Sequence, residues 1–152
     1  MPILFTPGQV MSALALSKQQ WRSYRKALAP LNVERGHSAC FSAGDILATA
    51  VVQSVANTLQ MPLSGFSAMA DALFSVCGNY AWPRLERSRL LLAIEESRVM
   101  LLDHEHSPPP CPLAIIVHLQ PLVGSLRETL VAAANDPQHD LAFPPMVAGG
   151  RP

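Results

Sequence analysis

The residues best suited to binding chemistry lie close together between Lys18 and Lys26. Ammonium and guanidinium groups bind phosphate oxygens, and a glutamine amide can donate to and accept from the edge of a base. Trp21, Tyr24 and Leu28 recur in this stretch at helical spacing and predict one buried face. The remaining side is polar and cationic, which suits a helix that enters a major groove. The predicted surface residues are Lys18, Gln19, Gln20, Arg22, Ser23, Arg25 and Lys26.

A second short helix is expected just before this one. Thr6 is a good N-cap, and Pro7 suits the first helical turn, where its missing N–H is no loss. Val10 and Leu14 supply the inward side of this helix, and Ser17 then caps the next one. Two amphipathic helices joined by a tight turn predict a helix-turn-helix, followed by a small loop or hairpin.

Five segments of this region occur in an order that is found in a known family. They are Thr6-Pro7-Gly8-Gln9-Val10, Leu16-Ser17, Trp21-Arg22-Ser23-Tyr24, Gly36-His37 and Phe41-Ser42-Ala43-Gly44-Asp45-Ile46. From about Phe5 to Leu59 the chain resembles the winged helix-turn-helix of the MerR-like transcription regulators. The resemblance implies binding to double-stranded DNA. It also implies that Arg22 and Tyr24 hold backbone phosphate, because they match the family's R-x-Y pair.

Three positions depart from the family pattern. Ala15 replaces the Gly before the turn, and Ser23 replaces the first Tyr of R-Y-Y. The wing lacks its Arg and reads His37-Ser38-Ala39-Cys40. This third departure leaves a second interpretation open, a protein-interaction adaptor or antagonist that keeps the helix-turn-helix shape without strong DNA binding. Beside the surface residues given above, the predicted DNA-binding set contains Thr6, Ser17, Tyr24, Arg35 and His37.

The charge of the chain is zero in total but unevenly distributed. The chain has 152 residues, of which 49% are hydrophobic. A neutral total argues against a non-specific nucleic-acid binder. Residues 1–60 hold five Lys and Arg against two acidic residues, whereas residues 61–152 hold six Arg against nine acidic residues. Such a division would orient the molecule on a polyanion, and ordinary scatter is the alternative.

Several protein classes are not expected from this sequence. The chain has no uninterrupted apolar run long enough for a membrane span and no secretory signal at its start. Cys40, Cys77 and Cys111 are an odd number and widely spaced, which argues against a disulfide framework and favours a reducing cytoplasm. No nucleophile elbow, phosphate-binding loop or H-E-x-x-H is present, so we do not expect an enzyme or a cofactor.

Two further helices are expected after the wing. Ser42 and Asp45 have the spacing of a capping box, and a long helix with a broad apolar stripe follows them. Another helix is expected to begin near Ser64 and to run to about Cys77. The aromatic and proline residues of Tyr80–Pro83 then predict a turn.

The period of the apolar residues changes after Arg87. Leu90–Ile94 and Arg98–Asp103 predict two strands around a short polar turn, and a single helix over Arg84–Leu102 is the competing interpretation. Leu113–Leu119 is aliphatic, β-branched and bounded by prolines, which predicts a third strand. The last helix is expected to open at Pro121 and to direct inward Leu122, Val123, Leu126, Leu130 and Val131.

These elements together predict an α+β chain. Residues 1–60 would form the winged helix-turn-helix, and residues 61–134 an α/β part with a small three-stranded antiparallel or mixed sheet covered by a C-terminal helix. That part would serve dimerisation or effector binding, and residues 135–152 are expected to be disordered. Three strands leave open edges that a second copy would complete. The resulting homodimer would present two recognition helices to a palindromic site.

Two other groups of residues suggest sites. Phe66, Phe74, Tyr80 and Trp82 suggest a pocket for a small-molecule effector, with core packing as the alternative. The cluster Asp103-His104-Glu105-His106 has two imidazoles and two carboxylates, but adjacent side chains point apart, and a solvated acidic loop is expected instead of a metal site.

The sequence as a whole predicts a cytoplasmic transcription regulator of bacterial or mobile-element type. It would bind double-stranded DNA in a sequence-specific manner as a homodimer, with RNA polymerase or another regulator as a further partner and with no membrane contact.

Overall fold

The structure is a computed structural model that describes residues 3–33 and 38–134. This part of the chain contains six α-helices, a two-stranded sheet and a three-stranded antiparallel sheet, so the predicted mixture of helix and sheet is confirmed. The α-helices are α1 (Pro7–Leu14), α2 (Lys18–Ala27), α3 (Ala43–Leu59), α4 (Ala70–Asn79), α5 (Trp82–Glu86) and α6 (Leu119–Ala134). The strands are β1 (Leu4–Phe5), β2 (Phe41–Ser42), β3 (Arg89–Ala93), β4 (Arg98–Leu102) and β5 (Ile115–His118).

Helices α1 and α2 each begin with a reciprocal side-chain cap. Thr6 Oγ1 accepts from the Gln9 amide at 3.2 Å, and the Thr6 amide donates to Gln9 Oε1 at 2.8 Å. Ser17 and Gln20 repeat this arrangement at the start of α2. These caps satisfy amide donors that a helix leaves unpaired at its N-terminus. The two helix starts predicted from the sequence are therefore confirmed.

The link between α1 and α2 contains an unusual backbone conformation. Ala15 ends α1 in the left-handed region, with φ 53° and ψ 46°. This conformation costs a residue with a Cβ more than it costs glycine. Gln53 of α3 donates to the carbonyl of Leu14 at 2.8 Å and satisfies one of the free acceptors at the end of α1. The link thus turns the chain sharply from α1 into α2.

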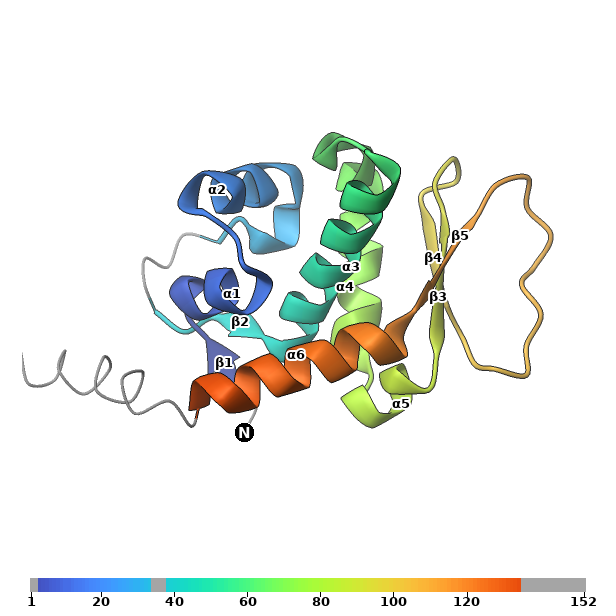
Figure 1. Cartoon of the computed structure of the whole chain (residues 1–152). Helices are drawn as coiled ribbons and strands as arrows, with labels where there is room; N and C mark the ends of the chain where they lie inside the picture. The colour runs from blue at the N-terminus through green and yellow to red at the C-terminus, as the bar shows by residue number, and fades with distance from the viewer. Residues whose placement is uncertain (1–2, 34–37, 135–152) are drawn as a thin grey trace, which may run out of the picture.

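Helix α3 is the central element of the fold. It lies between α1 and α4 in Figure 1 and is buried around most of its circumference. A capping box of Ser42 and Asp45 starts it, as predicted. Gly44 allows close approach to the end of α4, because a Cβ at this position would lie 2.7 Å from the carbonyl oxygen of Cys77. The small residues of α3 therefore permit tight packing between helices.

The segment after α3 differs from the prediction of one helix between Ser64 and Cys77. Leu63–Met69 forms a 3-10 helix, and only the following part is α-helical, as α4. Serine and glycine are weak helix formers, and Ser67 donates from its hydroxyl to the carbonyl of Ala27 at 2.9 Å. The predicted turn at Tyr80–Pro83 is also shorter than expected, since α5 already begins at Trp82.

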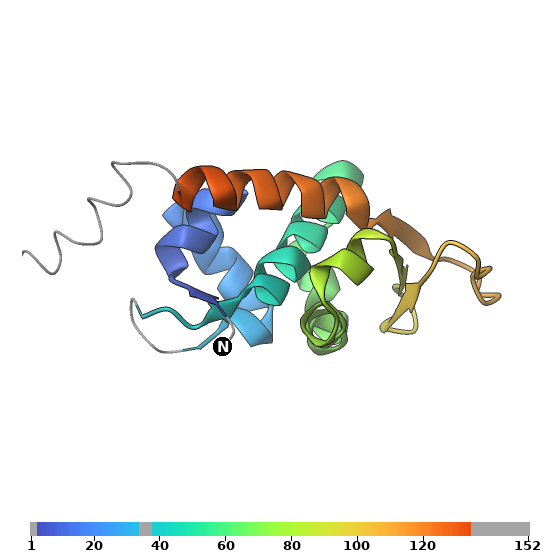
Figure 2. The same ribbon diagram turned by 90° about the horizontal axis from the view of Figure 1, so that it is seen from below.

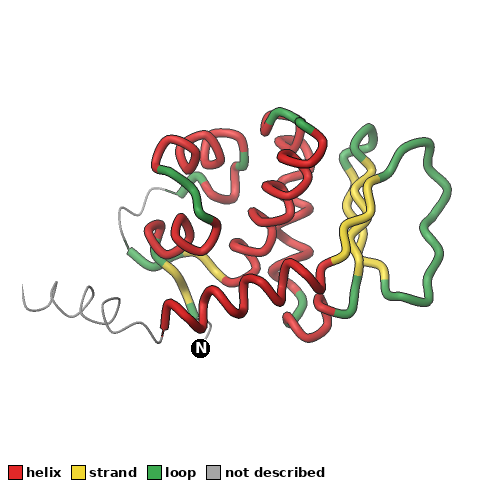
Figure 3. The backbone as a smooth tube through the Cα atoms, in the orientation of Figure 1, coloured by secondary structure: helices red, strands yellow, loops and turns green. Residues whose placement is uncertain are grey.

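The three-stranded sheet has the order β4-β3-β5, and both pairings are antiparallel. Ala93 pairs with Arg98 across the turn, so the predicted hairpin is confirmed and the single helix over Arg84–Leu102 is wrong. Figure 3 shows that the helices lie on one side of this sheet and that a long loop runs out on the other side. Strands β4 and β5 are the two open edges.

Helix α6 does not cover the sheet, contrary to the prediction. It runs across α1, α3 and α5, as Figures 1 and 2 show, while α4 packs against β4. The reason is the connection, because α6 begins at Leu119 directly after His118 and has no loop with which to fold back over the strands. Val131, expected to point inward, is 53% exposed.

One hydrophobic core extends through the described part of the chain. It joins Val10 of α1 and Trp21 of α2 to Leu90 of β3 and Leu126 of α6. A smaller cluster around Leu91 lies on the outer face of the sheet. The predicted boundary at residue 60 therefore falls within a shared core. Among the described helices, none has both the length and the hydropathy that crossing a bilayer requires. The predicted tail, residues 135–152, lies outside the described residues.

Candidate nucleic-acid interface

Helix α2 is held in place by its buried face. Trp21 and Tyr24 are 5% and 6% exposed, and Leu28 directly after the helix is fully buried. The ring of Trp21 contacts that of Phe41 edge to face, with centroids 5.4 Å apart. Because this face is fixed against the core, the opposite side of α2 points away from the protein.

Three cations form one stripe along the exposed side of α2. Lys18, Arg22 and Lys26 are spaced four residues apart, so they follow one another along the helix over about 12 Å. All three are exposed. Within the described residues none of them lies in an ion pair, and α2 itself contains no acidic residue. We call Lys18, Arg22 and Lys26 the cationic stripe.

A polar groove runs beside the cationic stripe. It has a volume of about 490 Å³ and separates α2 from the end of α3 and the turn that follows. Gln20 and Ser23 line it from α2, and Asn57 and Gln60 line it from the other side. The sequence analysis did not single out Asn57 or Gln60, since only the packing of α3 against α2 brings them near the predicted base-reading residues.

The exposed amides and hydroxyl of α2 are partly used within the helix. Gln20 Oε1 is occupied by the amide of Ser17, and Ser23 Oγ donates to the carbonyl of Gln19 at 3.2 Å. The Gln19 side chain makes no hydrogen bond to another described residue. Gln19 and the amino group of Gln20 are therefore the groups of this set that remain most available to a ligand.

Two predicted phosphate contacts have roles inside the protein. Tyr24 is buried, although it lines the polar groove, and burial raises the pKa of its hydroxyl. Arg25 is half-buried, and its guanidinium donates to the carbonyls of Leu31 at 3.2 Å and Val33 at 2.8 Å. Arg25 thus joins α2 to the chain that follows it. Whether either residue also contacts DNA stays a prediction.

The other predicted residues divide into two groups. Thr6 and Ser17 act as helix caps, and Ser17 is also exposed at the start of the cationic stripe. Arg35 and His37, the two candidates in the wing, lie outside the described residues. Next to that gap, β1 and β2 pair antiparallel, with Leu4 opposite Ser42.

No family model, curated protein or solved structure matches this chain. Its function is therefore argued from its own residues.

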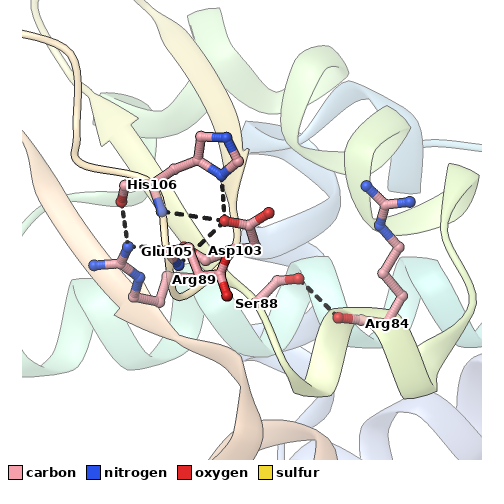
Figure 4. Close-up of polar contacts among 6 residues, drawn as sticks. All are labelled: Arg84, Ser88, Arg89, Asp103, Glu105 and His106. Atoms are coloured by element: carbon pink, nitrogen blue, oxygen red, sulfur yellow. Dashed lines mark hydrogen bonds and ion pairs between the residues drawn. The ribbon is translucent and has the colours of Figure 1, made fainter.

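The histidine and carboxylate cluster at the end of β4 forms a closed turn. Asp103 accepts from the amides of Glu105 and His106 and pairs with the His106 ring, as Figure 4 shows. The hydrogen bond from His106 holds the pKa of the Asp103 carboxyl below its usual value. Arg89 donates to the carbonyls of Asp103 and His106 at 2.9 and 2.8 Å. In the described residues no three His, Cys, Asp or Glu side chains converge on one point.

The aromatic residues suggested as an effector pocket do not share one cavity. Phe66 and Phe74 belong to the core. Tyr80 instead lines a cavity of about 420 Å³ together with Arg84 and Asp103, and the Arg84 guanidinium lies 4.8 Å from the centre of its ring. These aromatics therefore contribute mainly to packing.

Proposed function

We propose that this protein is a transcription regulator that binds double-stranded DNA with α2 as the recognition helix of a MerR-like winged helix-turn-helix. In this proposal α1 and α2 are the two helices of the motif, and the link at Ala15–Ser17 is its turn. The expected homodimer would place two copies of α2 on one palindromic site.

The cationic stripe is the observation that carries this proposal. Like charges four residues apart on a helix repel, at a cost of a few tenths of a kcal/mol for each pair. Lys18 also stands at the positive end of the helix dipole, where an acidic residue would be more stable. A protein that gained nothing from these charges would be more stable without them. A polyanion that binds across Lys18, Arg22 and Lys26 removes the repulsion.

The neutral polar residues beside the stripe support a duplex rather than an arbitrary anion. Gln19 lies at about 100° around the helix from Lys18 and therefore next to the stripe. Phosphates would contact the three cations and fix the orientation, while the amides of Gln19 and Gln20 reach base edges. The polar groove with Asn57 and Gln60 then adds further donors and acceptors at the same surface.

Fluorescence anisotropy with labelled duplexes tests the proposal. Preferred duplexes are selected from a random library, and the affinity is then measured between about 50 and 200 mM salt. We expect selected sequences to bind better than scrambled ones. We also expect the affinity to fall with a slope of about −0.9 for each phosphate neutralised, when the logarithms are plotted. Absent binding, or binding without salt dependence, would instead favour the adaptor or antagonist.

A further inference from the structure

Strand β5 has a free edge whose backbone groups can be identified. The amide of Leu119 donates to the carbonyl of Ser88 at 3.4 Å, which continues the ladder between β5 and β3. Hydrogen-bonded and non-bonded pairs alternate in an antiparallel ladder. Ile115 and Val117 therefore direct their backbone groups to β3, whereas Ile116 directs its N–H and C=O to the open side.

This edge lacks the usual protection against another strand. Natural edge strands carry charges, prolines or bulges that discourage pairing. Strand β4, the other edge, begins with Arg98, which pairs with Glu96 at 3.0 Å. Ile115–Val117 in β5 is instead aliphatic, neutral and free of proline. An edge of this kind is normally covered by another chain.

An apolar groove lies beside the same edge. Its volume is about 330 Å³, and it is bordered by β5, by the end of α3 with Val55 and Leu59, and by Leu122 of α6. None of the residues that line it is Lys, Arg, Asp or Glu. Leu59 is 51% exposed. Ile115 and Val117 lie on this side of the sheet, since they pack against the main core, and Ile116 belongs to the outer cluster.

We infer that a second copy of this chain occupies this edge and groove. Its β5 would pair antiparallel with the first about a two-fold axis through Ile116, which forms one six-stranded sheet. In this register Ile116 lies opposite Ile116 of the partner subunit, and Ile115 lies opposite Val117 of the partner subunit. Aliphatic side chains then meet aliphatic side chains, and no like charges are brought together. The partner's Ile115 and Val117 would fill the apolar groove against Leu59.

The symmetry of this pairing agrees with the proposed function, on which the purpose of the dimer rests. A two-fold axis perpendicular to the sheet leaves each face of the sheet on its own side. Because the helices lie on one side of the sheet (Figure 3), both copies would present α2 on that same side. A single duplex can contact two recognition helices only in such an arrangement. Pairing through the outer faces would place the two copies of α2 at opposite ends.

Molar mass measured by light scattering, without DNA, tests the inference. At tens of micromolar we expect twice the 16.4 kDa of one chain. Ile116→Pro removes an N–H that faces the open edge, and we expect this variant to be monomeric. Val99→Pro is the control, since alternation along β4 directs the Val99 N–H to the other edge, and this variant should stay dimeric. Thermal melting verifies that both variants fold.

A second pair of variants tests the groove itself. Leu59→Glu places a charge in the groove at an exposed position, and we expect it to convert the dimer to the 16.4 kDa monomer. Leu113→Glu changes a leucine that is 56% exposed and does not line the groove, and it should remain dimeric. A monomeric wild type, or a dimer that only Val99→Pro or Leu113→Glu disrupts, overturns the inference. Since no DNA is present, neither result decides whether α2 binds a duplex.

Discussion

The Arg25 guanidinium donates to the carbonyl of Val33 at 2.8 Å and so ties the last turn of α2 to the chain beyond it. Its Nε atom also donates to the carbonyl of Leu31 at 3.2 Å. Arg22, one turn earlier, is exposed and makes no hydrogen bond to another described residue. Two arginines of the same helix thus have different tasks, which a stability measurement can separate.

Arg25→Gln should lower the free energy of unfolding by about 1–2 kcal/mol, because two backbone carbonyls lose a charged donor. Arg22→Gln should change it by less than about 0.5 kcal/mol, or raise it slightly at low salt by relieving the repulsion from Lys18 and Lys26. Urea denaturation of both variants provides the comparison. Equal losses would mean that Arg25 has no special role in packing.

Ala15→Gly should stabilise the protein. The left-handed backbone of Ala15, with φ 53°, costs a residue with a Cβ about 1 kcal/mol that glycine does not pay. Part of this gain is lost because glycine is more flexible in the unfolded chain. We expect a net gain of about 0.5 kcal/mol in urea denaturation. A loss of stability would show that the link between α1 and α2 has another conformation.

Gly44→Ala should destabilise the protein by about 1–3 kcal/mol, because the new methyl group would collide with the backbone at the end of α4. Gly124→Ala in α6 is the control, since a Cβ at that position meets nothing within 4 Å. Alanine is the better helix former, so this control should gain up to about 1 kcal/mol. The opposite signs of the two changes make calorimetric melting a clear measurement.

Stability should decrease at alkaline pH because of Cys77. Burial, with a smaller contribution from the charge of Asp45, raises the pKa of this thiol from 9.0 to about 12. Above about pH 9 the unfolded chain releases the proton while the folded chain retains it, so each pH unit costs about 1.4 kcal/mol. Urea titrations at pH 8 and 10.5 would measure this decrease.

Cys77→Ala is the control for that titration. This variant lacks the thiol, and its stability should fall less between the two pH values than that of the wild type. The raised pKa of Tyr24 leaves a similar but separate contribution in both proteins. An identical decrease in the two proteins would contradict a buried, protonated Cys77.

The sequence was informative where a local pattern decides the structure. Ser17 and Gln20 have capping spacing, and Trp21 and Tyr24 have helical spacing, so the start and the buried face of α2 could be predicted. The hairpin of β3 and β4 could be predicted because apolar runs lie on both sides of the polar turn before Arg98.

Features that depend on contacts distant in sequence could not be predicted. The path of α6 follows from the direct joint at Leu119, which no local pattern reveals. Arg25 and Arg22 have the same charge on the same helix, and only the position of Val33 distinguishes them. Asn57 became a candidate because α3 packs beside α2, 33 or more residues away along the chain from Ser23 and Tyr24.

The salt dependence of DNA binding by a stripe variant tests the central claim most directly. Lys18, Arg22 and Lys26 are replaced together by Gln, and the matched control is Arg87→Gln, an exposed arginine in the segment after α5. The account predicts that the slope of log affinity against log salt becomes shallower by about 1 for each cation lost that contacts phosphate, while the control keeps the wild-type slope. An unchanged slope in the stripe variant would contradict the assignment of α2 as the DNA-binding helix.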